Sequence, residues 1–433
     1  MRQMCLASLR RTRTRWRAQR LPAGPTHAGV GVRSADVLAQ LVDRAYPVMT
    51  SFLGMTLVAA DPSEVVRGPA VWEVLRRPPR AEALGPTGGW MGFLGYDLAL
   101  GSGTLAPALP DPGGPPTAVL CRYETIAQIA PDGRCVVWGS GRSARELVGL
   151  ARDVAGVPAH GAVPVGSAPP AASLERAAYE QRVARIGAQI RAGDYSQVNL
   201  AQRLSGVWSG TPLEFANRLW SAAGPSSHAA FFGLPEGTLV SASPERLLRV
   251  AGGVATSSPI KGTALVGCGA ALAASVKDRA EHVMIVDLVR NDLGRVARPG
   301  GVSVTTLMAP LATGYVEHLV SEVRAELADG ITPGDVVAAV FPAGSITGCP
   351  KIAAMQAIAA LEPVARGAAY GSMIATAPNG SLDASVLIRS AWLHGAEAWY
   401  WSGGAVTWDS VPADEYAEAM AKARPFLEAL GCG

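Results

Sequence analysis

The stretch TLVSASPERLLRVAGGVATSSPIKGT, residues 238–263, holds two strand-like runs that are separated by turn residues and not by a helix. Residues 238–241 and 247–250 are rich in aliphatic side chains, with Ser-Pro between the runs and Gly-Gly after the second. Runs joined this closely pair as antiparallel strands, because parallel neighbours need a crossover of about a dozen residues. Helical patterns elsewhere do not alternate strictly with strands; they cover residues 174–192, 270–296, 332–340, 351–361 and 412–430. The sequence therefore predicts an α+β fold with largely antiparallel sheets.

Composition excludes several classes of protein. The chain of 433 residues is 49% hydrophobic, which is enough for a large buried core. Its net charge of +3 comes largely from the first 35 residues, which contain eight Arg and no acidic residue. The remainder is slightly acidic, so we expect no nucleic-acid partner. We expect no membrane partner either, because no apolar run reaches the about 18 residues of a spanning helix. Six cysteines without metal-type spacing favour a reducing, cytoplasmic location.

Two segments divide the chain. Residues 1–35 form a basic N-terminal extension, which we expect to be disordered or to reflect a start codon placed too far upstream. Residues 155–172 are rich in Pro, Gly and Ala and carry almost no charge, as in a connector. This connector separates an N-terminal region, residues 36–154, from a larger C-terminal region, residues 173–433.

Lysine is rare in this chain. Of 38 basic residues only four are Lys, and one of them, Lys261, lies between Pro-Ile and Gly-Thr in a stretch of small and apolar residues. A partly desolvated amine can lose its proton and act as a nucleophile, whereas a guanidinium stays protonated. Codon bias toward Arg, with four lysines left by chance, explains the same composition. The sequence alone leaves both explanations open.

Two helical patterns carry pairs of acidic residues. Asp278 and Glu281 are three residues apart, as are Glu415 and Glu418, so each pair shares one helix face. Two such faces directed at one point would make an oxygen-only site suited to Mg²⁺. Two solvated helix faces are the alternative.

Three further features are candidates for chemistry or structure. The turn Gly344–Lys351, GSITGCPK, supplies glycines, hydroxyls and a helix start, which together suit the binding of a carboxylate or phosphate. An ordinary capped turn before a helix would have the same sequence pattern. Glu245 follows a strand, where a general acid could lie. The charged run 287–295 inside an apolar helix is typical of a structural ion-pair network.

Several motifs recur in a fixed order along residues 173–433. They are GDYSQVNLAQR (193–203), SASPERLL (241–248), SPIKGT (258–263), KDRAEHVMIVDLVRNDLGRV (277–296), EHLVSEV (317–323), FPAGSITGCPK (341–351), LIRS (387–390) and SGGAVTWDS with DEYAE (402–418). Taken together they resemble the chorismate-utilising enzyme family. The segment GGWMGFLGYDLA (88–99) matches the family's N-terminal portion more thinly.

The resemblance implies a fold and a set of site residues. The fold would be a sandwich of largely antiparallel sheets flanked by helices. Lys261 would attack C2 of chorismate while Glu245 supplies a proton. Mg²⁺ would be held by Glu281 and Glu418, with Asp278 and Glu415 nearby. The residues implied in substrate binding are Gln197, His318, Gly344, Ser345, Thr347, Gly348, Arg389 and Gly404.

Two positions place the chain within the family. Gln197 stands where members that activate water carry a lysine, and Lys261 stands where anthranilate synthases typically carry an alanine. The chain thus resembles aminodeoxychorismate synthase component I, which joins chorismate and ammonia into 4-amino-4-deoxychorismate for p-aminobenzoate and folate synthesis. No glutaminase motif is present, so the resemblance implies a separate glutamine amidotransferase subunit, component II, as the ammonia source.

Two alternatives remain at this point. The first is anthranilate synthase component I. The second is a non-catalytic chorismate-binding or scaffolding subunit, because Ile374, Ala375 and Ala405 depart from the residues usual in the family. The segment Pro47–Ser51 also lacks the acidic residue of the family's tryptophan-feedback element, so inhibition by tryptophan is not expected.

Overall fold

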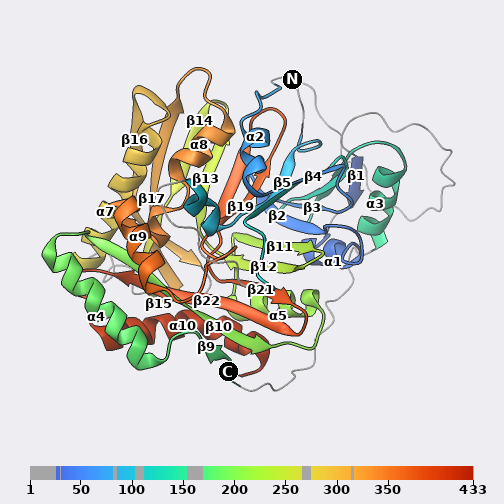
Figure 1. The fold of residues 1–433 in the computed structure, drawn as a ribbon. Coiled ribbons are helices and arrows are strands. Elements are labelled where there is room, and N and C mark those ends of the chain that lie inside the picture. Colours follow the sequence, from blue (N-terminus) through green and yellow to red (C-terminus); the bar gives the residue numbers. More distant parts are fainter. Residues whose placement is uncertain are drawn as a thin grey trace.

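The computed structural model describes residues 26–29, 31–80, 85–102, 112–153, 169–265, 275–313 and 316–432. They form two large sheets in which the described strands pair antiparallel (Figure 1). The first sheet runs β1 (Thr26–Gly29), β8 (Cys135–Trp138), β7 (Ile126–Ile129), β3 (Met55–Ala59), β2 (Val48–Phe52), β11 (His228–Leu234), β12 (Gly237–Ser243), β21 (Ser390–His394), β22 (Glu397–Val406), β10 (Gln197–Val207) and β18 (Gly348–Cys349), with β9 (Ala171–Ala172) also on β10.

The second sheet carries most of the motifs quoted above. Its order is β15 (Ile260–Leu265), β17 (Val316–Leu327), β14 (Val254–Ser258), β13 (Arg246–Ala251), β20 (Leu382–Val386), β19 (Ser372–Thr376), β5 (Trp90–Leu94), β6 (Ala118–Arg122) and β4 (Glu64–Arg67), and β16 (Ala297–Thr313) pairs with β17. Strand β2 of the first sheet contacts β19 and β20 of the second, and apolar residues of both sheets form one core cluster. The predicted α+β fold with antiparallel sheets is confirmed.

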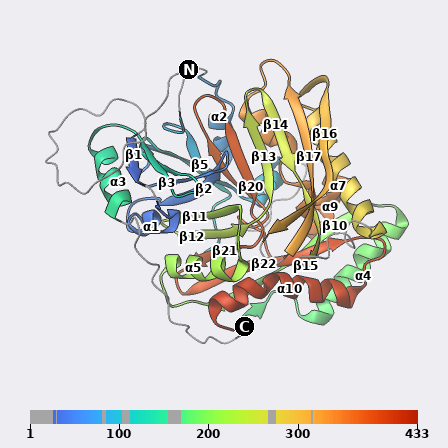
Figure 2. The ribbon, with the colours of Figure 1, turned by 180° about the vertical axis from the view of Figure 1, so that it is seen from behind.

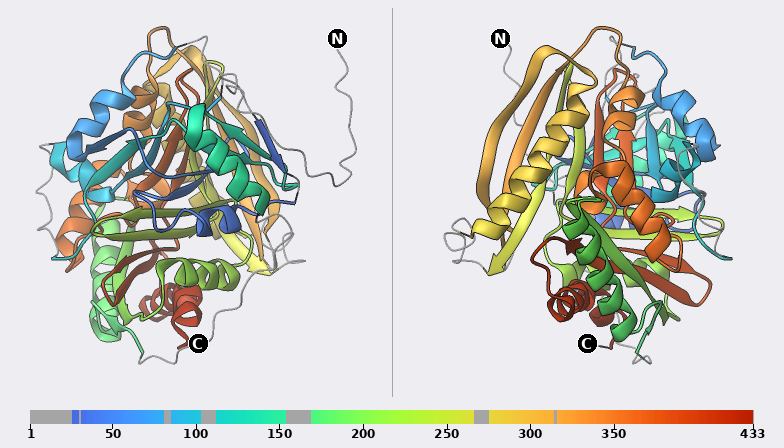
Figure 3. Two further views of the ribbon diagram at one scale, coloured as in Figure 1. Left: turned by 90° about the vertical axis from the view of Figure 1, so that its right-hand side faces the viewer. Right: turned by 60° about the vertical axis from the view of Figure 1, so that its left-hand side comes forward.

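Helices cover the outer faces of the sandwich. They are α1 (Ser34–Ala39), α2 (Val71–Leu75), α3 (Gly141–Asp153), α4 (Arg176–Ala192), α5 (Pro212–Ala223), α7 (Val276–Gly294), α8 (Pro333–Val340), α9 (Lys351–Leu361) and α10 (Pro412–Leu430), with 3-10 turns η1 (Gly68–Ala70), η2 (Tyr96–Ser102) and η3 (Gly344–Ile346). Figure 2 shows α10 crossing the first sheet beside α5, where Tyr400 stacks on Phe426. Figure 3 shows α7 lying along β16 and β17. Among the helices in the described part of the chain, none is both long and apolar enough to cross a membrane.

The N-terminal and C-terminal regions share both sheets. Strand β2 pairs with β11, and β5 pairs with β19, so each sheet joins residues from before and after the expected connector. The fold also begins before residue 36, because β1 pairs with β8. Residues 1–25 of the expected extension, and 155–168 of the expected connector, lie outside the described residues.

A buried arginine lies where several elements meet. Arg366 is only 2% exposed, and its guanidinium lies 4.5 Å from the ring centres of Tyr96 and Tyr370. It donates hydrogen bonds of 2.8 and 2.7 Å to the carboxylate of Glu362, which lies four residues earlier in the sequence. A buried charge is costly unless it is paired and hydrogen-bonded, and this guanidinium is both.

The same pair connects three segments that lie far apart in the sequence. Arg366 donates to the carbonyl oxygen of Ile346 in η3 at 2.8 Å and to that of Asn199 in β10 at 2.9 Å. Glu362, just after α9, accepts a 2.8 Å hydrogen bond from the backbone N–H of Ala201 in β10. The ion pair therefore fixes η3 relative to β10.

We predict that Arg366→Met lowers the free energy of unfolding by about 3–5 kcal/mol, because it leaves the Glu362 carboxylate buried without its partner. Urea denaturation followed by circular dichroism measures this change. The double variant Arg366→Met/Glu362→Leu removes both charges and should recover part of the loss. A single variant as stable as the wild type would show that the pair does not hold these segments together.

Candidate active site

Lys261 lies on β15, at a register irregularity between Lys261 and Thr263 in its pairing with β17. The amine is partly buried, and this burial is the main reason that its pKa is lowered from 10.5; the nearby Lys422 charge lowers the pKa further. The charges of Glu245, Glu281 and Glu418 act in the opposite direction, so these carboxylates lie around the amine. A lysine in this setting loses its proton more readily than an exposed one.

Glu245 lies between β12 and β13 and is 6% exposed. Its Oε1 accepts a 2.7 Å hydrogen bond from the hydroxyl of Ser345 in η3. Burial raises the pKa of this carboxyl, and the Ser345 hydrogen bond and the Lys261 charge offset only part of that rise. A carboxyl of raised pKa near an amine of lowered pKa is the pairing that a general acid and a nucleophile require.

The turn that contains Ser345 is shaped by close packing. A Cβ on Gly344 would lie 2.4 Å from the Leu288 side chain, and a Cβ on Gly348 would lie 2.0 Å from the Gln197 carbonyl oxygen. Gly348 also has φ of +144°, which side-chain-bearing residues rarely adopt. The buried Thr347 hydroxyl donates to the Ala343 carbonyl oxygen at 2.9 Å. The turn is thus pressed against β10 on one side and α7 on the other.

Three amide side chains on β10, those of Gln197, Asn199 and Gln202, are buried without complete hydrogen bonding among the described residues. Gln197 is 0% exposed, and neither its amide oxygen nor its amide nitrogen has a partner among the described residues. The amide oxygen of Asn199 is in the same condition. Buried polar atoms are nearly always paired, so these atoms mark a place where a polar ligand would supply the missing partners. Sequence reasoning included Gln197 in the site but missed Asn199.

The acidic residues of α10 face the end of β22. A Cβ on Gly404 would lie 3.1 Å from Oε2 of Glu415 and 3.6 Å from Oε1 of Glu418. Glu415 Oε1 accepts a 2.5 Å hydrogen bond from the Ser410 hydroxyl. The missing side chain at Gly404 therefore leaves room directly beside the two carboxylates.

Glu281 on α7 approaches the same end of β22. Its Oε1 accepts a 3.3 Å hydrogen bond from the hydroxyl of Thr407. Asp278 lies one turn earlier on α7, and its side chain is outside the described set. In the described part of the chain no three acidic, His or Cys side chains close into a ready-made metal cage. Mg²⁺ commonly binds one or two carboxylates and takes its other ligands from substrate and water, so this donor set fits the ion.

His318 and Arg389 are two further residues that the sequence implied in substrate binding. The buried His318 ring has Nδ1 3.2 Å from the carbonyl oxygen of Gly262, which can accept only a hydrogen bond, so Nδ1 carries the proton. Burial lowers the pKa of this imidazole, and the nearby Arg389 charge lowers it further. His318 is therefore neutral near pH 7. Arg389 follows β20 with φ of +50° and directs its backbone carbonyl at the N–H of Ala242.

Lys422 is a neighbour of the site that sequence reasoning missed. Its Nζ lies 2.5 Å from Oε1 of Glu418 and 3.3 Å from the carbonyl oxygen of Gly403. The i, i+4 spacing of Glu418 and Lys422 was the available signal, since such residues contact each other on a helix. Lys422 places a positive charge beside a carboxylate implied in metal binding.

The residues that depart from the family pattern lie in strands. Ile374 and Ala375 on β19 are fully buried in the core cluster, between β5 and β20. Ala405 on β22 pairs with Asn199. The bulk of Ile374 is thus accommodated by core packing.

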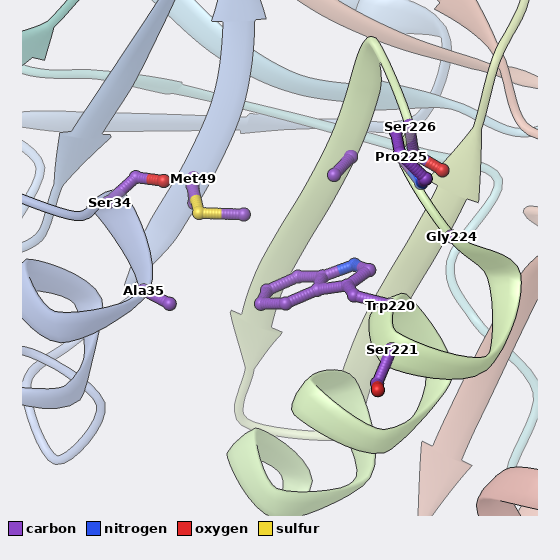
Figure 4. A pocket seen from close by; sticks show the side chains of 9 residues that line it. Ser34, Ala35, Met49, Trp220, Ser221, Gly224, Pro225 and Ser226 are labelled. Carbon is purple, nitrogen blue, oxygen red and sulfur yellow. The ribbon is translucent and has the colours of Figure 1, made fainter. Parts of the chain in front are cut away.

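A hollow of about 410 Å³ lies elsewhere (Figure 4). It is lined by residues of α1, β2, α5, the segment that follows α5, and β11. Met49, from the segment Pro47–Ser51, and Trp220 face it. It contains none of the carboxylates or lysines described above, so it is separate from the candidate active site.

Comparisons with known proteins identify the family of this chain. Residues 56–428 match the family model described as chorismate binding enzyme. The chain belongs to the chorismate-binding enzyme family. Anthranilate synthase component 1 of Pseudomonas aeruginosa is 38% identical over 60% of this chain and 54% of its own length. Aminodeoxychorismate synthase component 1 of Bacillus subtilis is 39% identical over 60% of this chain and 57% of its own length.

Solved structures show the same fold. Anthranilate synthase component I of Streptococcus pneumoniae superposes with a TM-score of 0.72 at 25% identity, covering 97% of this chain and 95% of that one. The menaquinone-specific isochorismate synthase of Escherichia coli gives a TM-score of 0.73 at 17% identity, covering 93% and 96%. The curated relatives quoted above are matched over little more than half of their length, and they divide between two names.

We predict that Gly404→Ala weakens Mg²⁺ binding about 10- to 100-fold, as changes beside metal ligands commonly do, because the new methyl group crowds the Glu415 carboxylate and fills the space beside Glu418. Isothermal titration calorimetry with Mg²⁺ measures the affinity directly. Gly149→Ala on α3 is a matched control, since its Cβ would meet nothing within 4 Å. Equal affinity in the two variants would remove these carboxylates from the metal site.

Proposed function

We propose that the chain is aminodeoxychorismate synthase component I, which converts chorismate and ammonia to 4-amino-4-deoxychorismate. The observation that carries the proposal is Lys261, an amine of lowered pKa that lies near the buried carboxyl of Glu245 and near Glu281 and Glu418. An alanine at this position, as in the typical anthranilate synthase motif, could not form a covalent intermediate. A relative 39% identical to this chain carries the proposed name.

In the first step the neutral amine of Lys261 forms a bond to C2 of chorismate. The two ring double bonds shift, the C4–O bond breaks, and the hydroxyl leaves as water with the proton of Glu245. The hydrogen bond from Ser345 holds the Glu245 carboxyl in place for this transfer. One difficult displacement is thereby divided into two easier ones.

In the second step ammonia forms a bond to C4. The double bonds shift back, the C2–N bond to Lys261 breaks, and the free amine is restored. The new C4 ammonium releases one proton, so the overall reaction consumes chorismate and ammonia and gives the amino product and water. We propose that a glutamine amidotransferase subunit supplies the ammonia, consistent with the component 1 designation of the relatives.

The substrate carboxylates would be bound by the acidic end of the site and by the turn Gly344–Gly348. Glu281 and Glu418, with Glu415 and Asp278 beside them, would hold Mg²⁺. When bound, the ion neutralises the ring carboxylate and fixes the ring beside Lys261. Arg389 would bind the other carboxylate as a charge-assisted hydrogen-bond donor. Gln197, His318 and Thr347 would contact the ring and its substituents.

Anthranilate synthase component I is the second candidate. It is favoured by the relatives that carry this name, among them one that is 38% identical. In that reaction ammonia is added at C2, the carbon that Lys261 would occupy in our mechanism. The two functions therefore differ in whether the Lys261 amine or ammonia attacks C2.

Product analysis tests the proposal. We expect the purified chain with chorismate, Mg²⁺ and ammonium to form a product that added aminodeoxychorismate lyase converts to p-aminobenzoate, as followed by mass spectrometry. Lys261→Ala and Lys261→Arg should both lose C4 amination, since Arg keeps the charge but cannot give up its proton. Anthranilate as the product would establish the second candidate, and bound chorismate without turnover would establish a non-catalytic subunit.

The pH profile supplies a separate prediction. Lys261 acts only after its amine has lost a proton, which happens below the ordinary value of 10.5 because burial lowers its pKa. Glu245 acts only while it is protonated, which persists above the ordinary 4.5 because burial raises its pKa. We therefore expect kcat/KM to give a bell-shaped profile with both limbs between these values. Glu245→Gln, whose side chain does not ionise, should leave one limb; an unchanged bell would exclude Glu245.

A further inference from the structure

A second buried ion pair lies near Glu245, and Glu245 and Asp292 line the same small cavity. Lys351, the first residue of α9, has Nζ 2.7 Å from Oδ2 of Asp292 on α7 and 3.1 Å from the carbonyl oxygen of Val340. The side chains of Lys351 and Asp292 are 14% and 7% exposed, so the pair is largely buried and the lysine is the more accessible member. The expected structural ion pairs of residues 287–295 therefore include one that extends to the start of α9.

A small cavity separates this pair from the general acid. The residues that line it include Glu245, Asp292, Ser257 and Ser345; the remaining lining is Arg246, Leu247, Pro259, Ile285, Val289, Val340, Ala343 and Gly344. Its volume of about 10 Å³ is about the smallest that admits one water molecule. With two acidic and two hydroxyl-bearing residues in its lining, the cavity can offer the two to four polar partners that a buried water requires.

We propose that one water molecule in this cavity links Glu245 to the Asp292–Lys351 pair, and that the pair returns a proton to Glu245 after each turnover. The inference rests on the proposed function, because it assigns Glu245 the role of general acid. Asp292 and Lys351 act through Glu245 and do not touch the substrate, so they are positioning residues.

The proton transfers balance. Glu245 gives its proton to the leaving C4 hydroxyl and becomes a carboxylate. The cavity water donates a proton to Glu245 and takes one from Asp292, which has received it from the Lys351 ammonium. Lys351 then recovers a proton from solvent through its exposed edge. The proton that ammonia sheds at C4 leaves on the substrate side, so the two proton paths do not cross.

The charges around the relay favour such transfers. Burial raises the pKa of Asp292, with Lys351 and Arg295 opposing that rise, and burial lowers the pKa of Lys351. Burial also raises the pKa of Glu245, against the Lys261 charge. These directions bring the acid and base pKa values of the groups closer together, which lowers the cost of each transfer. Burial raises the pKa of the nearby Cys349 thiol, and the charges of Asp287 and Asp292 raise it further.

Two variants test the relay in different ways. Asp292→Asn keeps the shape of the side chain but removes the proton-carrying group. Val289→Ile keeps both carboxyls and fills the cavity with one methylene, which excludes the water. Each has a matched control outside the cavity: Asp97→Asn removes another buried carboxyl, and Val71→Ile adds a methylene to the core elsewhere. Unfolding midpoints show whether all four variants are folded.

The turnover measurement uses chorismate, Mg²⁺ and ammonium in H₂O and in D₂O. We expect Asp292→Asn and Val289→Ile to lower kcat by about 10- to 100-fold, up to the low end of what general acid catalysis contributes, with KM for chorismate unchanged. Their solvent deuterium isotope effect on kcat should exceed that of the wild type, because reprotonation becomes rate-limiting. Values of kcat and isotope effect equal to those of the controls would overturn the relay and show that the C4 ammonium recharges Glu245.

A readout without turnover separates this inference from the proposed function. The infrared band of the protonated Glu245 carboxyl is identified as the band that Glu245→Gln removes. We expect Asp292→Asn and Val289→Ile to shift this band and the two controls to leave it in place. If the wild type converts no chorismate but the two variants shift this band, the proposed function is refuted and the link between Glu245 and the ion pair stands. If the band does not shift in the variants, the link is refuted whatever the product.

Discussion

The buried guanidinium of Arg366 is the constraint on which the site's geometry depends. It joins Glu362 to the backbone of η3 and β10, which come from different parts of the sequence. Ser345 lies in η3 and donates to Glu245, so the position of the general acid is set through a chain that begins at Arg366. Because the guanidinium lies between two aromatic rings, water cannot compete for its hydrogen bonds. A displacement of η3 would move both the acid and the glycines of the turn.

Burial shifts the pKa values of Lys261 and Glu245 in opposite directions. It favours the neutral form in each case, which for Lys261 is the amine that can attack and for Glu245 is the acid that can donate. The acidic residues at the end of β22 oppose this effect on Lys261, and Lys422 reinforces it. In the proposed mechanism, a single buried environment would therefore prepare both the nucleophile and the acid. The Asp292–Lys351 pair extends the same principle to a second buried acid and amine near Glu245.

Much of the architecture could be predicted from the sequence, and the reasons differ by element. Closely spaced strand runs between turn residues indicated antiparallel pairing, and the structure confirms it. The shared sheets were missed, because a Pro-rich connector suggests separate regions while β2 and β5 supply strands to sheets built mostly from later residues. The motif residues could be named one by one from the sequence. The contacts between them could not be predicted, because the hydrogen bond from Ser345 to Glu245 joins positions 100 residues apart and leaves no spacing signal.

The relatives divide between two names, anthranilate synthase and aminodeoxychorismate synthase, at similar identity to this chain. The two candidate reactions would use the same scaffold, because both need chorismate held by its carboxylates and a proton for the leaving hydroxyl. In the proposed mechanism they differ in the group that attacks C2, and the residue that would decide between them is Lys261 on β15. Lys261 is close enough to Glu245 for each charge to shift the other's pKa, which places an amine of the protein in the region where the acid acts. Under the proposed function, the Lys261 amine would occupy C2, so ammonia would be left with C4, and the regiochemistry would follow from which nucleophile is already bound.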